Sequence, residues 1–114
     1  MHERPWLHFL EDMIQSMERI VEYIQGYELH DFRKDFRTVD AVIRNFEVIG
    51  EASKNIPQEI KIKYQDVPWE EMYRLRNKIT HEYFGIDYEI IWDIANNYIP
   101  ANLKDLNEIL KLES

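Results

Sequence analysis

Apolar residues recur at helical spacing along almost the whole chain, and this periodicity limits the possible fold more than any other feature. Residues three and four positions apart share one face of a helix, so alternating steps of three and four indicate an amphipathic helix. The first such stripe is bounded by Pro5, which suits a first helical turn, and by Gly26, which suits a stop. The stripe contains Trp6, Leu10, Met13, Met17, Ile20 and Ile24, and is widened by Leu7, Ile14 and Val21.

A second long helix is predicted over residues 36–55. It ends before Pro57, because the residue before a proline is disfavoured in the α region. Its predicted inward residues are Val39, Val42, Ile43, Phe46 and Ile49. The small residues Gly50, Ala52 and Ser53 follow, and they would allow a neighbouring helix to approach closely. The polar stretch 27–35 predicts a turn or a brief helix, and 58–66 a connector that can include a helical turn.

Two more helices complete the predicted fold. Pro68 is expected at the first position of a third helix, which Gly85 would cap, and Asp87 is expected to cap a fourth helix from about Tyr88 to Leu112. Pro100 should kink that last helix. Its expected apolar side consists of Ile90, Ile91, Ile94, Tyr98, Leu103, Leu106 and Leu110. The chain therefore predicts one all-α domain over residues 1–114, an up-and-down four-helix bundle.

Composition excludes several classes of protein. The chain has no cysteine, which excludes disulfides, thiolate zinc sites and cysteine nucleophiles and suits a reducing cytoplasm. No apolar run is long enough to span a membrane. No two histidines have the spacing of a helical metal pair, and the three glycines form no phosphate-binding loop, so we expect neither metal nor cofactor. The net charge of −8 argues against a general nucleic-acid binder.

One segment, residues 74–83, concentrates the chemistry. It contains three permanent cations, and it also holds His81 and Tyr83. A guanidinium such as that of Arg76 binds phosphate through two parallel hydrogen bonds, and an imidazole can move protons near neutral pH. RNA carries its own nucleophile, the 2′-hydroxyl, so cleavage would need no metal, and Asn77 could orient the reacting groups. The alternative, which spacing alone favours, is a set of surface cations with a capping histidine.

Helix geometry constrains how Arg76 and His81 could act together. They are five positions apart, about 140° around an ideal helix, so one straight helix would not direct both at the same atom. Either the helix ends before His81, or a twofold dimer brings the residues of two subunits together, or both. Arg76 also shares a helical line with Met72 and Ile79. A charge there is costly unless it is paired or faces a cleft.

Two blocks of the sequence resemble a known family. The pattern Arg76-x-x-x-x-His81-x-Tyr83, after Pro68-Trp69 and before Phe84-Gly85-Ile86-Asp87, is similar to the motif of the HepT-like toxins of the HEPN superfamily. Residues 40–54, DAVIRNFEVIGEASK, are similar to the second helix of that family. The resemblance implies an all-α HEPN fold that forms a homodimer, with Arg76 and His81 of both subunits lining a cleft. Arg76 would clamp phosphate and His81 transfer protons, supported by Asn77, Glu51 and Lys54.

The same resemblance implies an activity and a partner. It implies a metal-independent endoribonuclease that acts on RNA as the toxin of a type VII toxin–antitoxin pair, beside an MntA-type nucleotidyltransferase antitoxin. That antitoxin would transfer AMP from ATP to Tyr83, and bulk and negative charge so near His81 would block the cleft and repel RNA. Two alternatives stay open: a non-catalytic HEPN dimer that chiefly binds the nucleotidyltransferase, and a pair in which this chain restrains a harmful nucleotidyltransferase.

Overall fold

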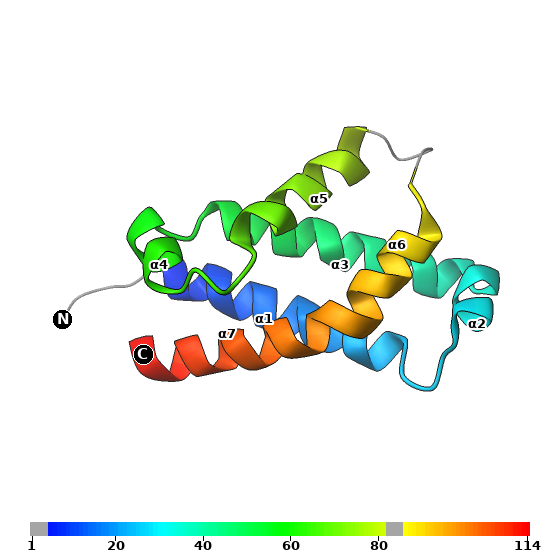
Figure 1. The fold of residues 1–114 in the computed structure, drawn as a ribbon, viewed down its shortest axis with the longest axis horizontal. Helices are drawn as coiled ribbons and strands as arrows, with labels where there is room; N and C mark the ends of the chain where they lie inside the picture. Colours follow the sequence, from blue (N-terminus) through cyan, green and yellow to red (C-terminus); the bar gives the residue numbers. More distant parts are fainter. Residues whose placement is uncertain (1–4, 82–85) are drawn as a thin grey trace.

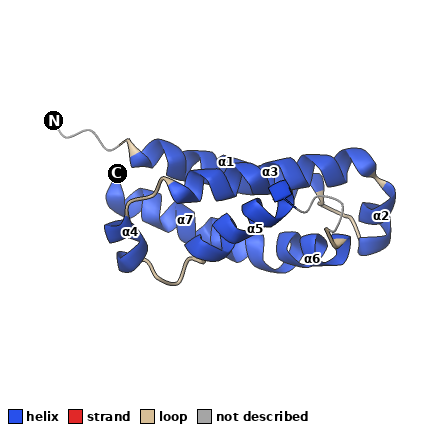
Figure 2. Ribbon diagram, turned by 90° about the horizontal axis from the view of Figure 1, so that it is seen from above, coloured by secondary structure: helices blue, strands red, loops and turns tan. Residues whose placement is uncertain are grey.

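Long helices packed side by side form the body of the molecule (Figures 1 and 2). The computed structural model describes residues 5–81 and 86–114, and it contains no strand in these ranges. Helix α1 (Trp6–Tyr23) packs between α3 (Phe36–Lys54) and α7 (Ile99–Glu113). Helix α5 (Trp69–His81) crosses α3 obliquely and contacts chiefly that helix. The predicted all-α fold class is confirmed.

The core is centred on α1 and α3 and extends to the helices that pack on them. All five predicted inward residues of the second long helix are buried, and so is most of the stripe on α1. Fully or almost fully buried side chains include Phe32, Leu10, Met13, Met17, Ile20, Ile49, Ile79, Ile91, Ile99 and Leu106. The helical periodicity of the sequence therefore identified the core of these elements, because a helix buries one continuous face.

Short helices connect the long ones. The stretch predicted as a turn or brief helix contains α2 (Leu29–Lys34), and the predicted connector contains α4 (Gln58–Lys63). Asp35 then caps α3: its carboxylate accepts hydrogen bonds from the Thr38 amide (3.1 Å) and hydroxyl (2.7 Å). The Tyr27 hydroxyl donates a further bond to it, 2.5 Å long. These bonds, led by that of Tyr27, lower the pKa of Asp35 to about 2, because they stabilise the ionised carboxylate.

The start of α5 differs slightly from the prediction. Pro68 precedes the helix, which begins at Trp69, and the carbonyl of Pro68 accepts the first helical hydrogen bond from the Met72 amide (3.1 Å). Pro68 therefore occupies the capping position and not the first helical one. Glu70 and Glu71 lie in the first turn, where a negative charge is favourable at the positive end of the helix dipole.

The predicted fourth helix is interrupted. It consists of α6 (Tyr88–Asp93), a π-helical segment η2 (Ile94–Tyr98) and α7, and the chain changes direction through η2 (Figure 1). The Ile99 amide donates to the Ile94 carbonyl, five residues back. This wider turn lies just before Pro100, which has no amide hydrogen to donate, so the irregularity lies upstream of the predicted kink.

The π-helical segment also changes which residues face the core. Ala95 and Ile99 are buried, whereas Ile90 and Tyr98, predicted on the apolar side, are 51% and 58% exposed. The wide turn inserts an extra residue into the helical repeat, so the prediction for Tyr98, which assumed a regular α-helix, was wrong. The prediction for Ile90 was also wrong: in α6, upstream of the wide turn, Ile91 is the buried residue and its neighbour Ile90 is exposed.

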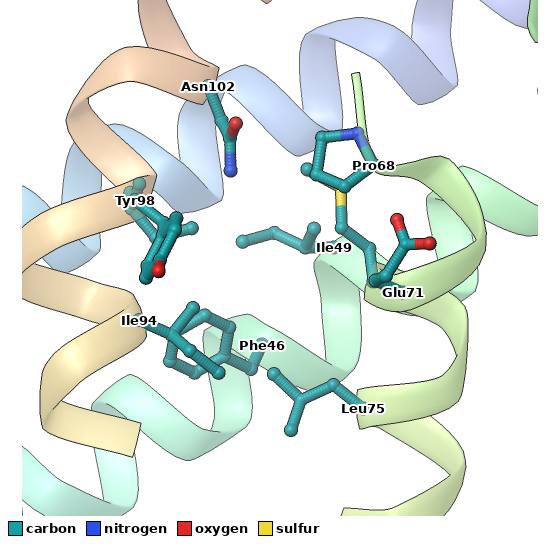
Figure 3. A pocket seen from close by; sticks show the side chains of 10 residues that line it. Phe46, Ile49, Pro68, Glu71, Leu75, Ile94, Tyr98 and Asn102 are labelled. Carbon is teal, nitrogen blue, oxygen red and sulfur yellow. The ribbon is translucent and has the colours of Figure 1, made fainter. Parts of the chain in front are cut away.

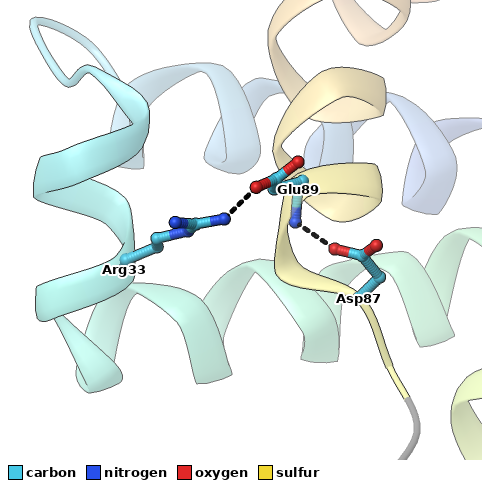
Figure 4. A network of polar contacts seen from close by, with 3 residues as sticks. All are labelled: Arg33, Asp87 and Glu89. Carbon is cyan, nitrogen blue, oxygen red and sulfur yellow. Dashed lines mark hydrogen bonds and ion pairs between the residues drawn. The ribbon is translucent and has the colours of Figure 1, made fainter.

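Helix α6 is held at its start by polar contacts (Figure 4). The Asp87 carboxylate accepts a hydrogen bond from the Glu89 amide (2.8 Å), which confirms the predicted cap. The Glu89 side chain forms an ion pair with Arg33 of α2. The predicted cap at Gly85 lies outside the described residues, as does Tyr83. None of the described helices is long and apolar enough to cross a membrane.

Candidate functional site

Small side chains on α3 bring α5 unusually close, as the sequence predicted. A Cβ atom added to Gly50 would lie 2.2 Å from the Cβ of Arg76 and 2.7 Å from the carbonyl oxygen of Met72. Farther along α3, the buried Ser53 hydroxyl donates a hydrogen bond to the Trp69 carbonyl (2.8 Å). The glycine therefore determines how near the backbone of Arg76 can lie to α3.

The guanidinium of Arg76 is held by two neighbours. Its Nη2 lies 3.2 Å from Oε2 of Glu51 on α3, and its Nη1 donates a hydrogen bond to Oδ1 of Asn77 (2.9 Å). The Arg76 side chain remains 30% exposed and that of Glu51 49% exposed. The structure thus places two of the three predicted supporting residues against Arg76, and it leaves part of the guanidinium open to a ligand.

His81 and Lys54 do not join this cluster. Helix α5 continues through His81, so the predicted possibility that the helix ends before this residue is wrong. Two features stabilise the last turn of α5. Its basic residues lie at the negative end of the helix dipole, and Ile79 packs into the core. His81 is exposed, at a position about 140° around the helix from Arg76. Lys54 is exposed at the end of α3.

A hollow of about 270 Å³ opens beside Arg76, between α1, α3 and α5. We call it the Arg76 hollow. It is lined by Phe9, Asp12, Arg44, Glu47, Val48, Glu51, Ala52, Asn55 and Arg76. The sequence prediction gave no role to Arg44, Glu47 or Asn55. Their spacing from Glu51, in helical steps of three and four, would have placed them on the same face of α3.

A second cavity, also about 270 Å³, lies between α5, α3 and the η2–α7 segment (Figure 3). We call it the apolar cleft. Side chains such as Phe46, Leu75 and Ile94 surround it, with Glu71 and Asn102 at its edge. Neither Arg76 nor His81 lines it. An almost wholly apolar lining cannot compensate a phosphate charge, so the apolar cleft is unsuited to binding phosphate. Within residues 5–81 and 86–114, no group of three or more metal-ligating side chains is arranged to hold an ion.

Comparison with known proteins identifies the family. The family model described as Ribonuclease HepT-like matches residues 13–111. "Putative RNase MJ0127" of Methanocaldococcus jannaschii is 48% identical over 103 residues, which cover 90% of this chain and 85% of that protein. "Putative RNase TTE0752" of Caldanaerobacter subterraneus is 42% identical, with 92% and 94% covered. "Probable ribonuclease HepT" of Thermococcus cleftensis is 43% identical, with 82% and 84% covered. No solved structure matches the chain.

The all-α bundle and the family match therefore define a helical ribonuclease of the HEPN type. More narrowly, the chain belongs to the Ribonuclease HepT-like family. The expected resemblance and the expected enzyme class, ribonuclease, are confirmed at the level of the family.

Proposed function

We propose that this protein is a metal-independent endoribonuclease whose active site combines Arg76 and His81 from the two subunits of a homodimer. The observation that carries the proposal is the partly exposed guanidinium of Arg76 at the edge of the Arg76 hollow, with an exposed imidazole at the end of the same helix. Because the two side chains leave α5 in different directions, a twofold partner supplies the second half of each site.

The chemistry needs only groups that the chain carries. Arg76 binds the oxygens of the scissile phosphate and stabilises the charge that develops on them. His81 of one subunit removes the proton of the ribose 2′-hydroxyl, the 2′-oxygen bonds to phosphorus, and the bond to the 5′-oxygen breaks. The same imidazole, now protonated, gives the proton to the departing 5′-oxygen. Glu51 and Asn77 hold the guanidinium in place, while Lys54 contributes positive charge nearby.

We further propose that the protein is the toxin of a type VII toxin–antitoxin pair and that its partner is an MntA-type nucleotidyltransferase. The hydroxyl oxygen of Tyr83, two residues after His81, would bond to the α-phosphorus of ATP in the partner's active site, and pyrophosphate would leave, so that AMP stays on the tyrosine. The added phosphate would place negative charge where RNA phosphate must bind, so the modified enzyme would be silent. Mass spectrometry of the chain made with and without the partner would locate the added AMP.

Cleavage of single-stranded RNA by the purified protein in excess EDTA tests the enzyme directly. We expect Arg76→Ala and His81→Ala each to lower the cleavage rate by about 10²-fold or more, because each removes a group that acts on the transition state. Lys78→Ala is the matched control, since Lys78 is an exposed cation on the same helix that does not line the hollow, and its rate should stay near that of the parent.

Two results would contradict the proposal. Equal cleavage by the parent and both variants would mean that a contaminating nuclease acts. A folded parent that binds the nucleotidyltransferase but does not cut RNA would favour the non-catalytic binding module, to which the net charge of −8 is suited. Expression of each member of the pair alone would show which one arrests growth.

A further inference from the structure

The Arg76 hollow contains more than an anion site needs. Its lining includes two guanidiniums, of Arg44 and Arg76, and three carboxylates, of Asp12, Glu47 and Glu51. Resting on the function proposed above, we propose that this hollow binds the nucleobase next to the scissile phosphate and that it selects guanine. The hollow would thus determine where RNA is cut, while Arg76 and His81 perform the cut.

The charge of the hollow favours a neutral ligand over a second phosphate. With three carboxylates and two guanidiniums, the lining is net negative, so a second phosphate would meet repulsion. A nucleobase is uncharged and is not repelled. The volume, about 270 Å³, lies just below the roughly 300–1,000 Å³ of sites for larger ligands, so it suits a single base.

Part of the lining of the hollow is apolar and can contact the base ring. Phe9 of α1 and Val48 and Ala52 of α3 contribute it. Proteins that read single-stranded RNA pack unstacked bases against aromatic and apolar side chains and then recognise their polar edges. Phe9 is only partly buried, so its side chain can still contact a ligand.

The polar side of the hollow offers acceptors. Glu47 is half-buried on α3, and across the part of the chain that the structure describes its carboxylate has no ion-pair or hydrogen-bond partner. A carboxylate only accepts hydrogen bonds, and guanine offers it two parallel donors, N1–H and the N2 amino group. Adenine and cytosine offer one amino group, and uracil one imide. Asn55 donates through Nδ2 to the Glu51 carbonyl (3.0 Å), which leaves its Oδ1 as a further acceptor.

Arg44 extends the same surface. Its guanidinium is exposed and, within the described ranges, has no carboxylate within 4 Å. It lies on α3 at the same hollow as Arg76, so it can stack on the bound base. Arg44 would thus hold the base while Arg76 holds the scissile phosphate.

The test uses short single-stranded RNAs that differ only in the nucleotides beside the cleavage site. Guanosine is compared with inosine, which lacks only the N2 amino group, and with uridine. We expect the intact protein to cut the guanosine substrate about tenfold faster, in kcat/KM, than the inosine substrate. Glu47→Gln, which loses one charge but keeps the shape, should bring that ratio close to one. The control is Glu22→Gln, which should leave the ratio unchanged, because Glu22 is an exposed acid of α1 that does not line the hollow.

A binding measurement separates this inference from the proposed nuclease function. His81→Ala protein, which should bind RNA without cutting it, is titrated with the same labelled RNAs. Tighter binding of guanosine than inosine, lost in the double variant with Glu47→Gln, supports the base site even if the parent cuts nothing. Equal affinity for both RNAs, or a preference that Glu47→Gln does not change, overturns it. If Arg76→Ala abolishes cleavage but the parent protein cuts the guanosine and inosine substrates at equal rates, the nuclease proposal is supported and the base site is contradicted.

Discussion

Arg76 shows how a single charged residue can be kept on an otherwise apolar helix line. Met72 and Ile79 on the same line are buried, yet the guanidinium reaches Glu51 and Asn77 at the surface. A half-exposed ion pair of this kind stabilises a fold by at most about 1 kcal/mol. Glu51 therefore matters mainly because it orients the guanidinium.

Asp35 is the residue whose ionisation the fold controls most clearly. Its pKa of about 2 lies below the ordinary 3.8, so the folded state retains the carboxylate at pH values where the unfolded state binds a proton. We expect Asp35→Asn to lower the free energy of unfolding at pH 7. That loss should shrink as the pH falls from about 4 to about 2, where the parent's own carboxylate becomes protonated. Urea unfolding at several pH values measures it.

Asp66→Asn is the matched control, because Asp66 is an exposed acid that caps no described helix. Its effect should be small at every pH. A loss of stability in Asp35→Asn that does not change between pH 7 and pH 2.5 would contradict the assignment of the carboxylate as an ionised cap.

At the scale of elements, the contact between α3 and α5 decides where the site lies. Gly50 permits the close approach, and the Ser53 hydroxyl fixes the start of α5 through the Trp69 carbonyl. Helix α5 contacts chiefly α3, so no other described helix would hold Arg76 in place if this contact opened.

Gly50→Ala should destabilise the protein although alanine is the better helix former by about 1 kcal/mol. The new Cβ would overlap Arg76 and the Met72 carbonyl, and overpacking of this kind costs roughly 1–3 kcal/mol. Because α5 must move to relieve the overlap, RNA cleavage should also fall. Chemical unfolding and the cleavage rate are the two measurements.

Gly26→Ala provides the comparison. Gly26 has a φ of 79°, in the left-handed region, and nothing lies within 4 Å of an added Cβ. Alanine there should cost about 1–2 kcal/mol of backbone strain, yet α5 should not move and cleavage should persist. A Gly50→Ala protein that is as stable and active as the parent would show that the two helices are less closely coupled than the structure indicates.

At the scale of the whole molecule, one subunit presents only half of the proposed site. The bundle is elongated, 49 × 29 × 21 Å, and α5 lies on one side of it, above α3 in the view of Figure 1. The acidic chain gives no broad attraction for RNA, so local groups must hold the substrate, and binding should depend less on salt than for a basic protein.

Mixing two inactive variants tests whether the site is shared. Arg76→Ala and His81→Ala proteins, refolded together, form dimers of which about half are mixed. A mixed dimer retains one site with an intact arginine from one subunit and an intact histidine from the other. We expect about a quarter of the parental activity to return, and light scattering to give twice the 14.0 kDa chain mass. A monomeric mass, or no recovered activity in verified mixed dimers, would contradict a shared site.

The sequence by itself determined the long helices and the buried faces of α1 and α3. It also determined that Asp87 caps the following helix and that small residues at Gly50 and Ser53 admit a neighbouring helix. These features depend on residues a few positions apart, and helical periodicity records them directly. The sequence could not show that η2 would rotate Tyr98 out of the core, because the helical repeat assumed a regular turn.

Only the tertiary structure decided which residues surround Arg76. Glu51 and Arg44 are far from it along the chain, and they meet it because the packing angle of α5 on α3 brings their faces together. A packing angle is set by the shapes of many side chains at once, so no short motif specifies it. The chain's own pattern thus predicted Arg76 and His81 as the reacting residues, and the packing of two helices determined the hollow that opens beside Arg76.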